Sequence, residues 1–157
     1  MSFDYLLITA PTQSISNVYH SLLINLKHQL PCLRNTHVLS VADPVDCRVG
    51  SGGGTLNALD QLLMEIGEVV FMKSRIAIIH SGGDSRRAPL HSVCGKAWAA
   101  VNSLSCGYTS SPMSLLIQEM DRFCNGILPG SAVVASGDVM LDITKVSLIY
   151  YAFESTM

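Results

Sequence analysis

Two glycine-containing segments of this 157-residue chain carry the residue types that bind anions. The first spans residues 48–55 and reads Arg-Val-Gly-Ser-Gly-Gly-Gly-Thr. Consecutive glycines let a backbone approach an anion closely, and the N-terminus of a following helix offers free N–H groups and a positive dipole end. We therefore interpret this segment as a phosphate-binding loop, with a merely flexible loop as the alternative. Its candidate ligands are Gly50, Ser51, Gly52, Gly53, Gly54 and Thr55.

The second segment follows an apolar run at residues 75–80 and concentrates positive charge. Five of the ten basic residues fall between positions 73 and 96, against a single acid, Asp84. Arginine forks bind phosphate oxygens in pairs, whereas a lysine acts as a point charge. Because only 14% of the residues are charged, this grouping indicates an anionic ligand, most simply one with phosphates, with a solvated surface loop as the alternative. The candidate residues are Gly82, Gly83, Asp84, Ser85, Arg86, Arg87 and Lys96.

A third feature is Asp138, which follows Gly137 after an apolar run at residues 131–136. Mg²⁺ commonly takes only one or two protein carboxylates and completes its coordination with phosphate and water oxygens. Asp138 beside the basic segment therefore predicts Mg²⁺ as cofactor, with a turn-forming aspartate as the alternative. His80 and His91 flank the basic segment, and we expect them to make local hydrogen bonds, with contact to the ligand as the alternative.

Two named nucleotide-binding motifs are absent. The pattern G-x-G-x-x-G, begun at Gly50, fails because Thr55 occupies its last position. The P-loop pattern fails because Ala97 follows the pair Gly95-Lys96 and because Leu90 occupies the position of its first glycine. These failures disfavour a dinucleotide-dependent oxidoreductase and leave general phosphate binding.

Alternating strand and helix patterns must position these segments. Apolar runs predict strands at residues 4–10, 36–42, 75–80 and 131–136. Periodic apolar stripes predict helices at residues 14–28, 55–66 and 112–125, the first of them capped by Ser14 or Ser16. This order predicts an α/β fold with a mostly parallel sheet and flanking helices. In such sheets ligands bind beyond the carboxyl ends of the strands, where the polar segments lie.

Composition excludes several classes of protein. With 48% hydrophobic residues and a net charge of −2, the chain is neither a disordered tail, a coiled coil nor a basic nucleic-acid-binding module. Its five cysteines contain no C-x-x-C pair, which favours reduced thiols. No secretory signal and no apolar stretch of ~20 residues is visible, so we expect a cytoplasmic protein without membrane or nucleic-acid partners.

Residues 48–59 and 79–89 together resemble the N-terminal region of the L-fucokinase and fucose-1-phosphate guanylyltransferase (GDP-fucose pyrophosphorylase) family. The resemblance extends from the first strand through Asp138 and implies a nucleotidyltransferase-like, Rossmann-like fold. It also implies a fucose-salvage transferase of phosphorus-containing groups, either kinase or guanylyltransferase, that uses GTP or ATP with fucose or fucose 1-phosphate. In this comparison Arg87 and Lys96 match catalytic residues that neutralise triphosphate charge, and Asp138 matches the metal-binding aspartate.

Members of this family continue well past the strand that ends at Asp138. The resemblance therefore predicts that residues 1–144 are the N-terminal part of such a domain and that residues 145–157 are a tail of unassigned role. We expect an incomplete domain, from a fragment, a splice form or a truncated gene model, that self-associates through exposed core. The alternative is a non-catalytic nucleotide-binding module that regulates or scaffolds a partner domain.

Overall fold

The structure, a computed structural model, describes residues 2–45, 47–81, 95–102, 109–137 and 139. Helices alternate with strands along most of the chain, and η marks a short 3-10 helix. In chain order the elements are β1 (Tyr5–Ala10), α1 (Gln13–Gln29), η1 (Pro31–Leu33), β2 (His37–Ala42), α2 (Gly50–Ile66), α3 (Glu68–Phe71), β3 (Ile76–His80), η3 (Lys96–Trp98), β4 (Val101–Asn102), β5 (Thr109–Ser110), α4 (Pro112–Phe123) and β6 (Ala132–Ser136).

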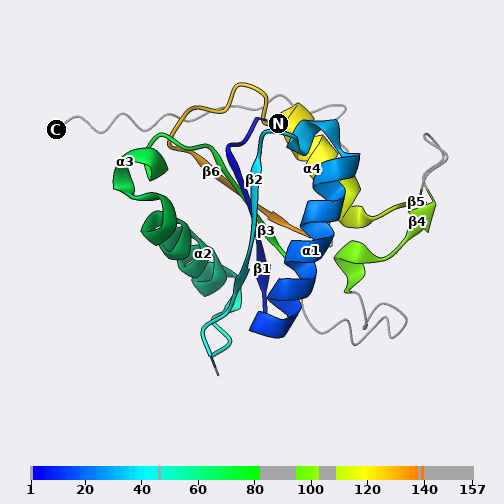
Figure 1. Cartoon of the computed structure of the whole chain (residues 1–157), viewed down its shortest axis with the longest axis horizontal. Coiled ribbons are helices and arrows are strands. Elements are labelled where there is room, and N and C mark those ends of the chain that lie inside the picture. The colour runs from blue at the N-terminus through cyan, green and yellow to red at the C-terminus, as the bar shows by residue number, and fades with distance from the viewer. Residues whose placement is uncertain (1, 46, 82–94, 103–108, 138, 140–157) are drawn as a thin grey trace.

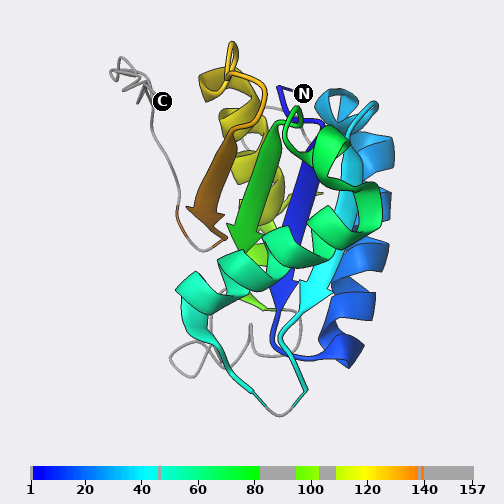
Figure 2. The ribbon, with the colours of Figure 1, turned by 90° about the vertical axis from the view of Figure 1, so that its left-hand side faces the viewer.

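Four strands form one sheet in the order β2-β1-β3-β6, and every pairing in it is parallel. Helices α1 and α4 lie on one face and α2 lies on the other, so the sheet is sandwiched between helices (Figure 1). All four strands run in the same direction, and α2 crosses the sheet diagonally (Figure 2). The predicted α/β fold with a parallel sheet and flanking helices is confirmed.

The core has two halves because successive strand residues point to opposite faces of the sheet. Leu6 and Ile79 pack with α1 and α4, whereas Leu7 and Ile78 pack with α2, and all four are fully buried. Strands buried on both faces read as continuous apolar runs, which is why β1 and β3 stand out in the sequence. Within the described part of the chain, no helix is both long enough and apolar enough to cross a membrane.

Helix α1 begins one residue earlier than its apolar stripe indicates, and neither predicted serine caps it. Thr12 is the N-cap, and its hydroxyl accepts a hydrogen bond from the Ile15 N–H at 3.3 Å. Ser16 is instead buried in the helix and donates to the Ser40 hydroxyl of β2 at 3.0 Å. The prediction of a cap at Ser14 or Ser16 was wrong. Threonine is also an N-cap residue, and Thr12 directly precedes the first residue of the helix.

The larger correction concerns the start of α2, which we predict from the sequence at Thr55. The helix begins at Gly50, so the glycine cluster forms its first turn and a half rather than a loop before it. Glycine costs about 1 kcal/mol per residue relative to alanine inside a helix, which is why the pattern favours a later start. Packing of the rest of α2 on the sheet through Ala58 and Leu62 offsets that cost.

Strand β6 is an outer strand of the described sheet and is the least covered. Its burial alternates, with Val133 and Ala135 packed against the core below α4 and with Ala132, Val134 and Ser136 exposed on the α2 side. Val134 is 49% exposed there. Helix α2 therefore covers the sheet from β2 to β3 and leaves the same face of β6 open.

Candidate functional site

Polar side chains form a row across the carboxyl end of the sheet. Thr9 of β1 lies in register with His80 of β3, and His80 lies in register with Ser136 of β6. Residues paired in this way point to the same face, and here it is the face covered by α2. Asp43, which follows β2, is tied to the same end by the hydrogen bond from its N–H to the Ala10 carbonyl at 2.8 Å. We call Thr9, His80 and Ser136 the polar row.

His80 is the centre of this row and is hydrogen-bonded through both ring nitrogens. Its Nδ1 lies 3.0 Å from the Thr9 Oγ1, and its Nε2 lies 2.8 Å from the Thr55 Oγ1 of α2. Burial lowers the pKa of the His80 imidazole below its ordinary value, and the nearby carboxylate of Asp43 opposes that shift without reversing it. The ring is therefore neutral at physiological pH, and the expectation of local hydrogen bonding at His80 is confirmed.

The N-terminus of α2 lies directly over this polar row. Its N-cap residue is Val49, which has no side chain able to cap, and its first turn contains no acidic residue. The first N–H groups of a helix have no partner within the helix, and the dipole gives that end a partial positive charge. Helix N-termini without a side-chain cap are able to bind phosphate oxygens through these N–H groups.

The local conformation requires glycine at two positions of this turn. Gly50 has a φ of +69°, a conformation that side chains with L configuration rarely adopt. A Cβ on Gly53 would lie 2.6 Å from the Cβ of Val49, so no larger residue fits without movement. Gly52 is different, because a Cβ there would meet nothing within 4 Å. Gly52 is thus an exposed glycine of this turn that neither φ nor crowding requires.

Other contacts hold the helix end in place. The Asn57 side chain donates from Nδ2 to the Ala42 carbonyl at the end of β2, at 2.9 Å. A Cβ built on Gly54 would lie 3.5 Å from the His80 Cε1 and 3.8 Å from the Asp43 Oδ1, so the helix, the imidazole and the carboxylate converge there. A carboxylate near a helix N-terminus stabilises it.

Lys96 opens η3 and lies at the same end of the sheet but against the other face. Ala97, its neighbour, belongs to the core half formed with α1 and α4. A Cβ on Gly137, the residue after β6, would lie 3.3 Å from the Cβ of Ala97. The ammonium group is therefore carried by an element that packs beside the end of β6, and Lys96 is half-buried.

Several predicted site residues lie outside the described residues. They are Gly82, Gly83, Asp84, Ser85, Arg86, Arg87 and Asp138, together with His91. The structure brings together Gly54, Thr55 and His80 from the remaining set, and it places the rest of the glycine turn and Lys96 at the same end of the sheet. Of these, the Thr55 hydroxyl already has protein partners, since it also donates to the Ser51 carbonyl at 3.0 Å.

Few of the described side chains are available to bind Mg²⁺ at this end of the sheet. Across the residues that the structure describes, no three His, Cys, Asp or Glu side chains are grouped to hold a metal. Mg²⁺ commonly takes one or two protein carboxylates and draws its other ligands from phosphate and water. Asp138 stays the predicted protein ligand.

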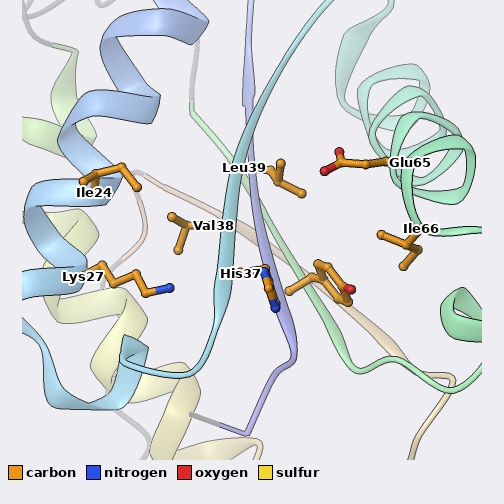
Figure 3. A pocket seen from close by; sticks show the side chains of 8 residues that line it. Ile24, Lys27, His37, Val38, Leu39, Glu65 and Ile66 are labelled. Carbon is orange, nitrogen blue, oxygen red and sulfur yellow. The ribbon is translucent and has the colours of Figure 1, made fainter.

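Two cavities among the described residues lie at the opposite, amino end of the strands. One, of about 420 Å³, is open along β2, with Ile24 and Lys27 of α1 on one side and Glu65 and Ile66 of α2 on the other (Figure 3). Its lysine is already used, because the Lys27 Nζ donates to the Thr36 carbonyl at 2.8 Å. The other, of about 480 Å³, is lined by Ser2, Arg75, Asp121, Arg122, Asn125 and Gly126.

Comparison with known proteins places the chain in a family. The sequence profile of the fucose pyrophosphorylase domain matches residues 68–156, more than half of the chain. The chain belongs to the fucose pyrophosphorylase family. No solved structure matches it. The profile match begins at α3 and runs through both β3 and β6, the strands that carry His80 and Ser136.

Curated relatives agree with this family. A bifunctional fucokinase/GDP-fucose pyrophosphorylase of Arabidopsis thaliana is 27% identical over 138 residues, which cover 76% of this chain and 13% of the relative. A fucose-1-phosphate guanylyltransferase of Mus musculus is 30% identical over 141 residues, covering 88% of this chain and 23% of the relative. The human protein of that name is 34% identical over 101 residues, covering 63% and 16%. The chain thus spans less than a quarter of the length of these relatives.

Sequence reasoning missed Thr9 and Asp43 as members of this site. Both are polar residues at or just after the carboxyl end of a predicted apolar strand, and this is the signal by which Asp138 is selected. Thr9 is the one hydroxyl residue in the run Leu6 to Ala10, and it is 8% exposed. A buried hydroxyl in an otherwise apolar strand indicates a hydrogen-bonding partner.

Proposed function

We propose that the carboxyl end of this sheet binds the phosphates of a nucleoside triphosphate in a fucose-1-phosphate guanylyltransferase type of reaction. The observation that carries the proposal is the uncapped N-terminus of α2, which is built from glycines and held over the polar row. Membership of the fucose pyrophosphorylase family supports the class of reaction. The names of the relatives supply fucose 1-phosphate and a guanine nucleotide as the substrates to test first.

In this reaction a phosphate oxygen of the sugar 1-phosphate attacks the α-phosphorus of the nucleoside triphosphate. The new P–O bond gives the nucleotide sugar, and the bond to the bridging oxygen breaks to release pyrophosphate. Such displacements depend on positioning and on neutralising charge rather than on covalent catalysis. The N–H groups of Gly50 to Gly53 would hold phosphate oxygens, and Arg87 and Lys96 would offset the charge on the leaving pyrophosphate.

Asp138 would hold Mg²⁺ together with phosphate oxygens. When bound, Mg²⁺ neutralises charge on the triphosphate and draws its oxygens into one orientation. The chain's own contribution at this end of the sheet is to present N–H groups from the α2 face and Lys96 from an element on the opposite face.

The test is pyrophosphate release by the full chain with fucose 1-phosphate, GTP and Mg²⁺, compared with ATP in place of GTP. Release above a blank without protein supports guanylyl transfer. Transfer of the γ-phosphate of ATP to fucose, measured with labelled ATP, would point to the kinase reaction instead. Binding of GTP without either product supports the alternative, a non-catalytic nucleotide-binding module, and the absence of any binding contradicts both.

We also propose that the chain self-associates through the uncovered side of β6. Exposed apolar side chains lie on this strand and nearby, with Val134 at 49% and Leu128, before β6, at 62% exposed. An outer strand with an open apolar face favours pairing with a second copy. Sedimentation velocity of the chain and of a Val134→Lys variant tests this, because the variant should shift a dimer to monomer. A wild-type chain that is monomeric at high concentration contradicts it.

A further inference from the structure

His80 makes contacts that no motif in the sequence explains, because its ring joins three elements at one point. The side chain comes from the last residue of β3, and its two nitrogens reach Thr9 of β1 and Thr55 of α2 at 3.0 and 2.8 Å. Thr9 is buried, and Thr55 lies in the second turn of the helix whose first turn is the glycine cluster. The next residues along the chain lead into the predicted basic segment at 82–87.

The number of available hydrogens indicates which ring nitrogen carries the proton. Thr55 has one hydroxyl hydrogen, and the Ser51 carbonyl, 3.0 Å away, can only accept. If Thr55 donates to Ser51, its oxygen must accept from His80, so the proton is on Nε2. The Nδ1 is then free to accept the hydroxyl hydrogen of Thr9. In this arrangement the hydroxyl hydrogens of Thr9 and Thr55 and the Nε2 hydrogen of His80 each have one acceptor. Both ring nitrogens then make a hydrogen bond.

We propose that His80, as the neutral imidazole with its proton on Nε2, is a positioning residue that fixes the N-terminus of α2 for phosphate binding. The chain Thr9–His80–Thr55–Ser51 runs from the sheet into the first turn of the helix, where the phosphate-binding N–H groups of the proposed function lie. This inference rests on that proposed function for its ligand. The helix end has a second support in the Asn57 contact to Ala42, so loss of the ring loosens the first turn without detaching the helix.

The protonation state is measured directly by long-range ¹H–¹⁵N correlation of the histidine rings in the full chain without ligand. We expect the pattern of the Nε2–H form for the signal that disappears in the His80→Gln variant. The exposed His20 and His28 serve as internal references, since rings in solvent exchange between forms. A His80 signal of the Nδ1–H form, or of an exchanging ring, overturns the proposed arrangement.

The positioning role is measured by the affinity for GTP with Mg²⁺ and for pyrophosphate alone. A net hydrogen bond accounts for roughly threefold to tenfold in an equilibrium constant, so Thr55→Val and His80→Ala should each weaken binding by that factor. Because both variants break the same chain, the double variant should lose no more than either single one. His80→Gln should bind more tightly than His80→Ala, since its amide N–H₂ can donate to Thr55.

Thr36→Val is the matched control. The Thr36 hydroxyl is buried at the amino end of the sheet and donates to the Phe3 carbonyl at 3.1 Å, so its loss lowers stability without touching the helix end. Its affinity should equal that of the wild type. Equal affinity of Thr55→Val and wild type, or additive losses in the double variant, overturns the role. A wild-type chain that binds neither probe overturns the proposed function, and the positioning role with it, while the ring spectrum still decides the protonation state.

Discussion

The two ends of the parallel sheet use their polar residues in different ways. At the amino end, charged groups are paired with one another and with the backbone: Arg75 donates to Asp4 from Nε, Nη2 and its own N–H, at 3.1, 3.2 and 2.8 Å. The Ser2 N–H donates to the Asp121 carboxylate at 2.6 Å. At the carboxyl end, the polar row satisfies itself through His80, yet the helix above it begins without a side-chain cap.

We interpret this difference as a division of roles: the amino end stabilises the fold, and the carboxyl end is the proposed binding site. Polar groups at the amino end pair with one another and stabilise the attachment of β1 to β3, and two cavities also lie there. At the carboxyl end, polar contacts hold a helix N-terminus in place, and we propose that its N–H groups bind the ligand. A phosphate site needs oriented donors more than an enclosed volume, so the two cavities do not by themselves mark the binding end. Five variants test this comparison.

The largest effect is expected from removing the cations predicted to face the phosphates. The Arg87→Ala/Lys96→Ala double variant should weaken GTP binding by at least about a hundredfold, since hydrogen bonds to charged groups contribute roughly 1.5–3 kcal/mol each. Isothermal titration calorimetry measures the change. Arg122→Ala removes a cation at the amino end, where its side chain is 76% exposed, and serves as the control with unchanged affinity. Similar losses in both variants would mean that the ligand responds only to overall charge.

The next effect separates the glycines of α2 from one another. Gly50→Ala should lower the free energy of unfolding by about 1–2 kcal/mol, because its φ of +69° is unfavourable for an L residue. Gly52→Ala should leave that free energy unchanged or raise it by up to about 1 kcal/mol, since alanine favours the helix and nothing crowds the position. Chemical denaturation measures both.

The GTP affinity of Gly52→Ala is a further test of the proposed binding end. If its backbone lies against a phosphate, the variant should bind GTP more weakly although it is at least as stable as the wild type. A stable variant with wild-type affinity would place the ligand elsewhere than this turn.

A smaller effect is expected at the amino end. Asp4→Ala should lower the free energy of unfolding by about 1 kcal/mol and leave GTP affinity unchanged, because the pair with Arg75 is about 40% exposed and screened by solvent. Burial alone would raise the pKa of Asp4, but the hydrogen bonds from Arg75 outweigh it and lower the pKa. The stabilisation is therefore present above the carboxyl group's ordinary pKa and is lost as the pH falls through the lowered one. Denaturation of wild type and variant at acidic pH should converge.

The smallest effect is the pH dependence that His80 contributes. Because the pKa of His80 is lowered in the folded chain, the unfolded chain takes up the proton first. Stability should be complete above the ordinary histidine pKa of about 6.5 and fall as the pH drops below it. Wild type should lose more stability than His80→Gln between neutral pH and pH 5 in thermal denaturation. Parallel curves for the two proteins would contradict the shift.

The sequence predicted the strands and the layered arrangement correctly, but it predicted the ends of the helices less well. Apolar runs located all four strands of the main sheet because β1 and β3 are buried on both faces. The start of α2 was wrong because glycine disfavours helix in isolation, and only packing on the sheet shows that Gly50 belongs to it. The short β4, β5 and α3 were missed because segments of two to four residues have no recognisable period.

The candidate site was predictable in kind but not in detail. The glycine cluster lies at the carboxyl end of the sheet, which is where the rule that ligands bind beyond the carboxyl ends of strands predicts a site. The partners of His80 depend on the register that sets Thr9 beside it and on the angle of α2, and neither can be read from spacing along the chain.

The most direct test of the central claim is a ¹H–¹⁵N amide titration of the full chain with GTP and Mg²⁺. If phosphates bind at the uncapped end of α2, the largest shifts should fall on the amides of Gly50, Ser51, Gly52 and Gly53, with Lys96 next. The amides of Asp4 and Arg75, at the other end of the same strands, should not move. Largest shifts at the amino end, or no shifts at a saturating concentration of GTP, would contradict the assignment of this end of the sheet as the nucleotide site.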